Sequence, residues 1–492
     1  MQDSYKILSS IFKEIGILQS ISALSQWDND VFMPKKSSQL KQDQMVFLSG
    51  QMYQRLTNPK IAELIENCTN LDSLEQSNLD IIKKKYLRNK AVDQHFVEKI
   101  TKAGLECELN WRNARKNNDF KLFSLHFKPL LKLIQEISLR EAEALKLSPY
   151  NALLDSYDPG RTSEEVDIIF SEIEKFLPSL ISQVREKQKS QNPINFNSSF
   201  PLDSQKNIGL ACMKAFNFDL DRGRLDVSTH PFSVGLSPED VRLTTRYEEN
   251  NFLSGLFGIL HETGHGIYEQ NLPLENKYQP VAKACGMSIH ESQSLFFERH
   301  IGIAKNFFHW LEPILEKEFG YNKALEAENL YKLATKMDTS LVRVDADEVT
   351  YPAHIIMHYK LEKDLLSGDL QIDDLPEAWD EMSLKLFGAK PKNLAQGCLQ
   401  DIHWAWGSIG YFPTYTLGAI FASQIDRHLR KNIDMDSLIL NANYAPITSW
   451  LKDNIHNNGS KYSANELIEK SVGSKLDVNI FKEHLINKYL TD

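Results

Sequence analysis

The chain is 492 residues long, and its 56 Lys and Arg against 66 Asp and Glu leave a formal net charge of −10 at pH 7. This acidic balance excludes the basic surface on which nucleic-acid binding depends. The 22 glycines and 18 prolines are few for this length, which favours helices over many short strands and excludes the collagen-like and disordered classes.

Residues 1–145 are predicted to be helical because apolar side chains recur three and four positions apart, as in Leu8, Ile11, Phe12, Ile15 and Leu18. The N-terminal segment lacks the cleavage site of a secretory signal and is interpreted as an amphipathic helix. We find no run of about 18 apolar residues, the length that a membrane span needs. The five cysteines are odd in number and have no CxxC spacing, so we expect a cytoplasmic protein.

Prolines at 149 and 159 predict a break, after which Thr162 and Glu165 have the spacing of a capping box that begins a new helix. Residues 188–206 are polar and predict a surface loop. Residues 223–247 alternate in polarity and are rich in β-branched side chains, so they are the candidate for a small β-sheet. Helices are expected again over 250–335, over 343–366 and from 374 to the end.

The segment His261-Glu-Thr-Gly-His265 lies in a stretch of helical periodicity. On a helix, His261 and His265 are one turn apart, so that both imidazoles can bind one tetrahedral Zn²⁺ ion while Glu262 points toward a water molecule on the metal. The alternative interpretation is a pair of histidines on a packed helix.

A catalytic zinc site needs a third protein ligand and one open position. Glu291 follows His265 by 26 residues and lies in a second predicted helix. We predict Glu291 as the third ligand, with His290 and His300 as rivals that spacing alone does not eliminate.

Five motifs now resemble the thermostable carboxypeptidase (carboxypeptidase Taq-like) family of zinc metallocarboxypeptidases. In order, they are Asp240-Val-Arg242-Leu-Thr244, HETGH at 261–265, His290-Glu291-Ser292, Val342-Arg343-Val-Asp-Ala346-Asp347 and Gly397-Cys-Leu-Gln400-Asp401-Ile-His403-Trp404. The resemblance extends over nearly the whole chain. It departs at His358, where relatives tend to carry arginine, and this departure puts a local salt bridge in question.

The resemblance implies an all-α, bilobed, zincin-like body around a deep substrate groove, with the small sheet near the active site, and a homodimer. It implies a carboxypeptidase of broad specificity that removes the carboxy-terminal residues of peptides, with zinc or cobalt as the metal. Because the candidate residues extend from 230 to 415, we expect one catalytic domain over 1–492, although length alone suggests about three domains.

In the implied mechanism, Glu262 is the general base that accepts the proton of the attacking water. A guanidinium is the natural partner of a free α-carboxylate. By resemblance this partner is Arg343, which Asp345 and Asp347 could orient. Arg242 is a second candidate for substrate binding. The alternative for Arg343 is an arginine that only pairs with those aspartates.

An oxyanion in the transition state calls for a neutral donor. The candidates are Tyr411, favoured over Tyr415, together with His230 and His403. Aromatic residues near them, namely Trp404, Trp406 and Phe412, are expected to line the groove. A second HxxxH, formed by His354 and His358, lacks the adjacent Glu and is interpreted as a core feature rather than a metal site.

Two other functions remain open on the sequence. The first is a helical zinc oligoendopeptidase or dipeptidyl carboxypeptidase, which shares HExxH and a distal Glu but blocks its groove elsewhere. The second is a non-enzymatic helical binding protein with a structural zinc. A closed structural site would need a fourth protein ligand, and no thiolate lies next to HETGH.

Overall fold

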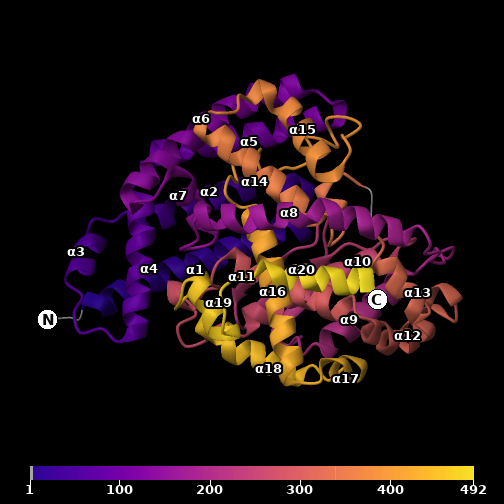
Figure 1. Cartoon of the computed structure of the whole chain (residues 1–492). Helices are drawn as coiled ribbons and strands as arrows, with labels where there is room; N and C mark the ends of the chain where they lie inside the picture. Colours follow the sequence, from indigo (N-terminus) through magenta and orange to yellow (C-terminus); the bar gives the residue numbers. More distant parts are fainter. Residues whose placement is uncertain (1–3, 338–339, 492) are drawn as a thin grey trace. The chain divides into compact units, whose positions relative to one another are not determined.

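A computed structural model describes residues 4–337 and 340–491. Helices make up most of the described chain, and one small sheet falls within residues 223–245, so the predicted mainly helical class is confirmed (Figure 1). The chain forms two units, each assembled from three separated segments. The first unit comprises residues 1–89, 192–335 and 418–476, and the second comprises 90–191, 336–417 and 477–492.

The first unit contains most of the helices and all three strands. Its helices are α1 (Ser4–Val31), α2 (Ser38–Leu56), α3 (Lys60–Glu66), α4 (Ser73–Lys90), α9 (Leu202–Ala215), α10 (Phe252–Gln270), α11 (Met287–Leu295), α12 (Lys305–Phe319), α13 (Ala327–Ala334), α17 (Met435–Leu440), α18 (Ala445–Asn454), α19 (Ala464–Val472) and the greater part of α16 (Pro413–Asn432).

Helix α1 confirms the helix that was predicted at the N-terminus. By length and composition alone it could cross a bilayer, which is weak evidence for a single helix near the start of a chain. Its Leu8, Phe12 and Ile15 are buried in a cluster with residues of α3 and α4. These residues form the buried face of α1, whereas Ile17, Ile21 and Leu24 are exposed.

The sheet consists of β1 (Gly223–Val227), β2 (Ser233–Ser237) and β3 (Asp240–Thr245) in the order β1-β3-β2. Strand β3 pairs in parallel with β1 and antiparallel with β2, with a bulge between Gly235 and Ser237. Val241 and Leu243 of β3 are fully buried. The sheet therefore packs one face into the core of the first unit, and α10 packs against its central strand β3 and its edge strand β2.

The second unit is all helical within its described residues. Its helices are α5 (Gln94–Asn117), α6 (Phe120–Leu145), α7 (Pro149–Tyr157), α8 (Ser163–Gln188), α14 (Tyr351–Ser367), α15 (Leu375–Phe387) and α20 (Val478–Ile486).

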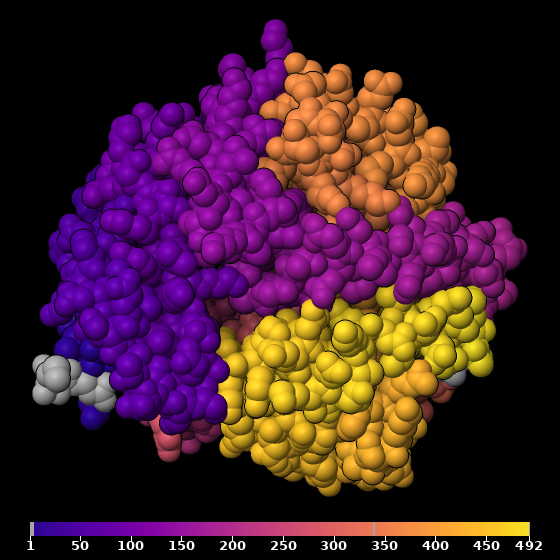
Figure 2. All heavy atoms as spheres, turned by 60° about the vertical axis from the view of Figure 1, so that its left-hand side comes forward, coloured from indigo at the N-terminus to yellow at the C-terminus, as the bar shows by residue number. Residues whose placement is uncertain are grey.

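Helix α8 begins where the sequence predicts, because the Thr162 hydroxyl accepts from the Glu165 backbone and the Glu165 carboxylate accepts from the Thr162 backbone. Segments far apart in sequence lie side by side in this unit: α14 packs on α6 and α8, and α15 packs on α8. Figure 2 shows the orange atoms of this later segment lying against the purple and magenta atoms of the earlier one.

A buried carboxylate organises the interior of the second unit. Glu362 of α14 accepts hydrogen bonds from the Tyr150 hydroxyl, the Trp404 indole and the Gly410 backbone, each at 3.0 Å. Burial raises the pKa of Glu362 to about 8. One side chain thus fixes helix α7 and the loop 394–412, which carries the Gln400-Asp401-Ile-His403-Trp404 motif.

Candidate functional site

Helix α10 places the HETGH motif in the core of the first unit. Leu253, Leu256 and Leu260 recur at helical spacing and are buried, so they set the face that α10 turns inward. Glu262 and His265 are less than a tenth exposed, and His261 is half-buried. The predicted helix is confirmed.

Two glycines allow helices to approach the motif closely. A Cβ on Gly264 would lie 2.4 Å from the backbone oxygen of Gln293, and a Cβ on Gly418 of α16 would lie 2.9 Å from Cβ of Glu291. A side chain at either position would push a helix away. The glycine inside HETGH therefore lets α11 bring Glu291 up to the two histidines.

The three predicted metal ligands converge. One ligand atom from each of His261, His265 and Glu291 lies within 4.8 Å of the others. Nε2 of His265 is 3.5 Å and Nε2 of His261 is 3.8 Å from Oε2 of Glu291. Zinc bonds of about 2.0–2.2 Å to nitrogen and oxygen would fit this spacing, so the donor set suits a divalent metal with an open position.

The far side of each imidazole is held by another side chain. Nδ1 of His261 is 2.8 Å from Oε2 of Glu298, and Nδ1 of His265 is 2.6 Å from Nδ1 of His290, whose Nε2 lies 2.9 Å from Glu269. Such partners fix ring orientation and leave Nε2 for a metal. His290, a rival for the third ligand, therefore lies behind His265.

The other rival, His300, lies on the π-helical turn η3 (Phe296–Gly302) and does not belong to the group of converging ligand atoms. Its Nδ1 is 3.8 Å from Asp426, and its ring stacks on Phe296. Position thus favours Glu291 over both rivals.

The electrostatics of the cluster favour a bound cation. Burial would lower the pKa of His261, but Glu291 and Glu298 raise it to about 9. Burial and the neighbouring His290 lower the pKa of His265 to about 3, which keeps this ring neutral, as a metal ligand must be. Burial alone would raise the pKa of Glu291, but the two histidines lower it to about 2.

Glu262 lies next to this cluster and is buried. Burial, together with the charge of Glu291, raises its pKa to about 7, while His261 and a hydrogen bond from Ser233 of β2 act in the opposite direction. A carboxylate with a pKa near neutrality can both accept and return a proton. The sheet thus contributes directly to this cluster, through the first residue of its edge strand.

In the second unit, Arg343 is the centre of a separate cluster, the Arg343 cluster, formed with Tyr351, Asp401, His403 and Tyr415. Its Nε and Nη2 donate to the two oxygens of Asp401, both at 2.7 Å, and Nη1 donates to the Tyr351 hydroxyl at 2.9 Å. These bonds use three of its five N–H groups, so two remain for a ligand.

The neighbours of Asp401 complete this arrangement. Gln400 accepts from the Arg343 backbone at 2.7 Å, and His403 Nδ1 is 3.1 Å from Asp401. Asp347, expected to orient Arg343, instead accepts from the backbone of Val349 and Thr350. The guanidinium is oriented by Asp401 of the GxxQDxHW motif, which corrects that expectation.

Several predicted residues line the same cluster. The ring of Tyr415 lies 5.4 Å from the Arg343 guanidinium, and its hydroxyl is 3.4 Å from His403 Nε2. Tyr411 packs on Tyr415 and on His403, with ring centroids 5.2 and 5.6 Å apart. Burial lowers the pKa of His403, so its ring is neutral.

The other predicted site residues, Arg242 and His230, are not part of the Arg343 cluster. Arg242 pairs with Asp240 at 2.8 Å within β3 and lies over the Trp27 ring. His230 is an exposed residue between β1 and β2. Both belong to the first unit, and their proposed roles stay predictions. Of the expected aromatic lining, Trp404 is buried and Trp406 is exposed.

The second HxxxH does not form a metal site with any third ligand in the described ranges. His354 packs on Phe387, with the ring centroids 4.5 Å apart. Nε2 of His358 lies 3.1 Å from a carboxylate oxygen of Asp401, so the position that departs from the resemblance still places a nitrogen beside this carboxylate.

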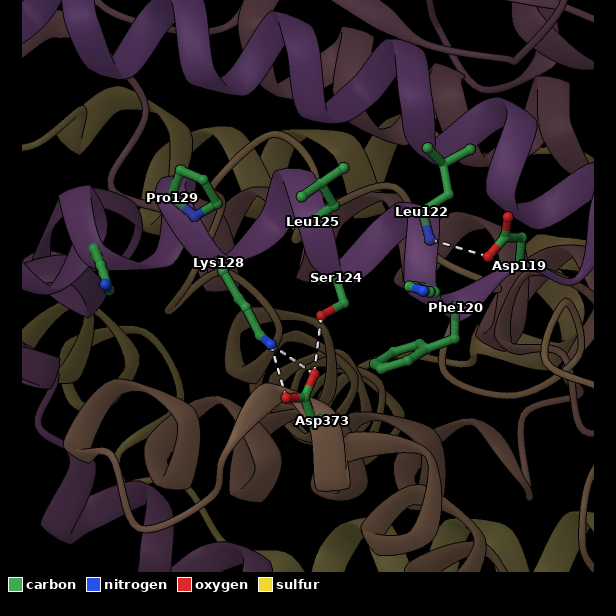
Figure 3. A pocket seen from close by; sticks show the side chains of 10 residues that line it. Asp119, Phe120, Leu122, Ser124, Leu125, Lys128, Pro129 and Asp373 are labelled. Atoms are coloured by element: carbon green, nitrogen blue, oxygen red, sulfur yellow. Dashed lines mark hydrogen bonds and ion pairs between the residues drawn. The ribbon is translucent and has the colours of Figure 1, made fainter.

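A surface hollow of about 1120 Å³ lies along α6, and its lining includes none of the motif residues. In Figure 3, Ser124 and Lys128 both point toward Asp373, and each donates a hydrogen bond to its carboxylate. The hollow therefore contributes none of the groups on which the metal cluster or the Arg343 cluster depends. The hollow is lined by Asp119, Phe120, Lys121, Leu122, Ser124, Leu125, Lys128, Pro129, Lys132 and Asp373.

Sequence reasoning missed Glu298, Ser233 and the role of Asp401. Glu298 follows Glu291 by seven residues, which places both on one helical face, so its position could have been found. Asp401 stands in a recognised motif, but its partner lies 58 residues away in sequence. Ser233 carried no signal.

The HExxH helix, the converging ligands and the mainly helical architecture define a metallopeptidase. The family profile of the Carboxypeptidase Taq (M32) metallopeptidases matches residues 7–489. The chain belongs to this family, and it is therefore a metallocarboxypeptidase, a peptidase hydrolase.

Relatives and solved structures agree over the full length. Thermostable carboxypeptidase 1 of Thermus thermophilus is 32% identical, over 99% of this chain and 98% of that protein. Carboxypeptidase 1 of Bacillus subtilis is also 32% identical, over 97% and 96%. The structure of Trypanosoma cruzi metallocarboxypeptidase 1 is 34% identical, with a TM-score of 0.97 over all of both chains. A Pyrococcus furiosus carboxypeptidase structure is 30% identical, with a TM-score of 0.94 over 100% of this chain and 99% of that one.

Proposed function

We propose that this metallocarboxypeptidase uses zinc, held by His261, His265 and Glu291, with cobalt as a substitute. The observation that carries the proposal is the convergence of the three ligand atoms within 4.8 Å. When bound, the metal would polarise the scissile carbonyl and lower the pKa of water toward 7. The carboxylates around the histidines support a cation at this position.

Glu262 is the general base in this proposal. It follows His261 directly on α10, and its pKa of about 7 is the result of burial first and of Glu291 second. It would accept a proton from the attacking water and return it to the leaving nitrogen. No covalent intermediate is required.

Arg343 is proposed to bind the carboxy-terminal carboxylate of the peptide through its two remaining N–H groups. The bidentate pair with Asp401 supports this role because it fixes the plane of the guanidinium. His403 and Tyr415 would line the same binding site, and Arg242 would contact the substrate backbone. Tyr411 and His230 are the proposed donors to the transition-state oxyanion.

The remaining proposals concern the substrates, the localisation and the oligomeric state. We propose that substrates are peptides with a free carboxy terminus, cleaved with broad specificity and poorly next to proline, and that the protein is a cytoplasmic homodimer with one catalytic domain around a substrate groove. The five motifs and their resemblance to the family support these statements. Sedimentation equilibrium tests the dimer directly.

The decisive experiment pairs two peptides of identical sequence, one with a free carboxylate and one with a carboxy-terminal amide. The enzyme is stripped with a chelator and reconstituted with zinc or cobalt before each assay. We expect hydrolysis of the free peptide alone, restored by one metal ion per chain. Equal rates for both peptides would favour the oligoendopeptidase alternative, and metal loss accompanied by unfolding would favour a structural zinc.

A further inference from the structure

His358 is a buried polar residue to which the proposed mechanism gives no role. It lies on α14 and is fully buried. Its ring packs on Phe412, Trp379 and Trp404, with centroid distances of 4.1, 4.9 and 5.5 Å. Because aromatic rings surround the imidazole, it can make polar contacts only through its two ring nitrogens.

Each ring nitrogen of His358 lies close to an oxygen atom. Nδ1 is 2.7 Å from the backbone oxygen of His354, and a carbonyl oxygen only accepts, so Nδ1 carries a hydrogen. Nε2 lies 3.1 Å from Oδ2 of Asp401. A lone pair there would face a carboxylate oxygen in a buried environment, where the repulsion is strong. The 3.1 Å approach to Asp401 does not meet hydrogen-bond geometry at Nε2, but it is close enough for an ion pair if the ring carries a hydrogen on each nitrogen.

Asp401 links this ring to the guanidinium. Its Oδ2 accepts from Arg343 Nε and faces His358, while its Oδ1 accepts from Arg343 Nη2 and faces His403. Arg343 itself is only 7% exposed. A buried carboxylate held from two sides by cations cannot rotate without losing one of them.

The net charge of the Arg343 cluster depends on whether His358 carries a hydrogen on both ring nitrogens. Arg343 and Asp401 cancel, and the pKa values of His403 and His354 are both lowered, chiefly by burial, so these rings are neutral. Glu362, one turn along α14, has a pKa of about 8 because it is buried. Tyr351 and Tyr415 carry no charge near neutral pH. Protonated His358 thus leaves one surplus positive charge.

We propose that His358 is an imidazolium that acts as a positioning residue: it holds Asp401 against Arg343 and supplies the surplus charge that a peptide carboxylate neutralises. This inference rests on the proposed role of Arg343 in binding the substrate carboxylate. It assigns a function to a histidine that touches neither the substrate nor the metal ligands.

The test uses the full-length, metal-loaded enzyme and two variants. His358→Phe keeps the aromatic packing and removes both donors, whereas His358→Gln keeps one neutral donor. We expect KM for a free-carboxylate peptide to rise about 10- to 100-fold in His358→Phe, as loss of a contact to a charged group implies. We expect a smaller rise in His358→Gln and less change in kcat than in KM in both.

The matched control is His354→Phe, a buried histidine one turn earlier on α14 with no contact to Asp401. It should leave KM within about twofold, because its ring already packs on Phe387. A second readout is the dissociation constant of a product dipeptide at one fixed pH. His358→Phe should bind the dipeptide more weakly than the wild type does, whereas His354→Phe should bind it equally well.

Three results separate the possibilities. An unchanged KM in folded His358→Phe, with a raised KM in Arg343→Ala, would overturn this inference alone. An unchanged KM in both variants would overturn the proposed role of Arg343 as well. If His358→Phe fails to fold, NMR of histidine ring nitrogens in the wild type decides, with His358→Gln to assign the signal: two protonated nitrogens support the imidazolium, and a neutral tautomer at pH 6 overturns it.

Discussion

In the metal cluster of the first unit, the carboxylates of Glu262, Glu291 and Glu298 surround two imidazoles, so negative charge is in excess. In the Arg343 cluster of the second unit, a single carboxylate, Asp401, is flanked by Arg343 and His358, so the proposed imidazolium of His358 would put positive charge in excess. The first arrangement is suited to bind a cation and the second an anion. Buried ionisable groups are costly unless compensated, so in the proposed roles each cluster has a net charge that its ligand would neutralise.

The largest effect is expected from removing the base in the metal cluster without removing its ligands. Glu262→Gln should lower kcat by about 10³-fold, because general-base catalysis contributes 10²–10⁴-fold, yet keep one metal ion per chain. Steady-state kinetics and elemental analysis of the same preparation check both statements.

Glu275→Gln makes the same chemical change at an exposed residue and serves as the matched control with unchanged kcat. Substantial turnover in Glu262→Gln, at full metal occupancy, would assign the base to another residue.

The next-largest effect is expected from a substitution in the Arg343 cluster. Arg343→Ala should lower kcat/KM by about 100-fold on free-carboxylate peptides, since two charge-assisted hydrogen bonds to substrate are lost. Both a higher KM and a lower kcat are expected. Progress curves at several peptide concentrations separate the two parameters.

Arg343→Lys keeps the charge but cannot form the fork with Asp401, so it should fall between the wild type and Arg343→Ala. Unchanged kinetics in Arg343→Ala would show that the arginine only pairs with Asp401 and takes no part in substrate binding.

A smaller effect should come from the residue behind a metal ligand. Glu298→Gln removes the negative charge that orients His261 through Nδ1 at 2.8 Å, and metal affinity should drop about 10- to 100-fold. Competition with a chromogenic chelator measures this affinity. Glu136→Gln, at an exposed site on α6, is the control, and equal affinities in the two variants would remove Glu298 from the metal cluster.

The smallest effect on turnover is expected from Glu362→Gln, whose main consequence is for stability. The pKa of Glu362 is raised from 4.5 to about 8 in the folded chain by burial. Between these values the folded state holds a proton that the unfolded state lacks, so stability present below about pH 4.5 is lost as pH rises to about 8.

The resulting decrease in the free energy of unfolding amounts to a few kcal/mol at most. Glu362→Gln should abolish this slope, because an amide does not titrate and its oxygen still accepts from a neighbour. Chemical unfolding midpoints at several pH values are the measurement. Parallel pH profiles for wild type and variant would show that Glu362 is ionised in the fold.

The sequence allowed the helical class, the small sheet and the capping box at Thr162 to be predicted, because each follows from local periodicity or spacing. It also allowed the metal ligands to be proposed, since two lie on one helical turn. The partners of Arg343 were harder to predict. Asp345 and Asp347 were near in sequence, but the geometry favours Asp401, whose proximity depends on the fold of loop 394–412 rather than on any local pattern.

Residues that contact the metal cluster were likewise predictable only where a local sequence pattern places them. Glu298 shares a helical face with Glu291 and was accessible to periodicity, whereas Ser233 approaches Glu262 only because β2 packs on α10. The groove between motifs, the dimer and the roles of His230, Arg242 and Tyr411 stay predictions.

Each of the two units is assembled from three separated stretches of chain. During synthesis, the first unit cannot be completed until residue 476 has left the ribosome, and the second cannot be completed until the final helix α20 has emerged. Contacts of such high sequence separation slow folding. Both the HETGH helix and Arg343 would therefore stay unassembled until residues far later in the sequence, up to 476 and in α20 respectively, complete their units.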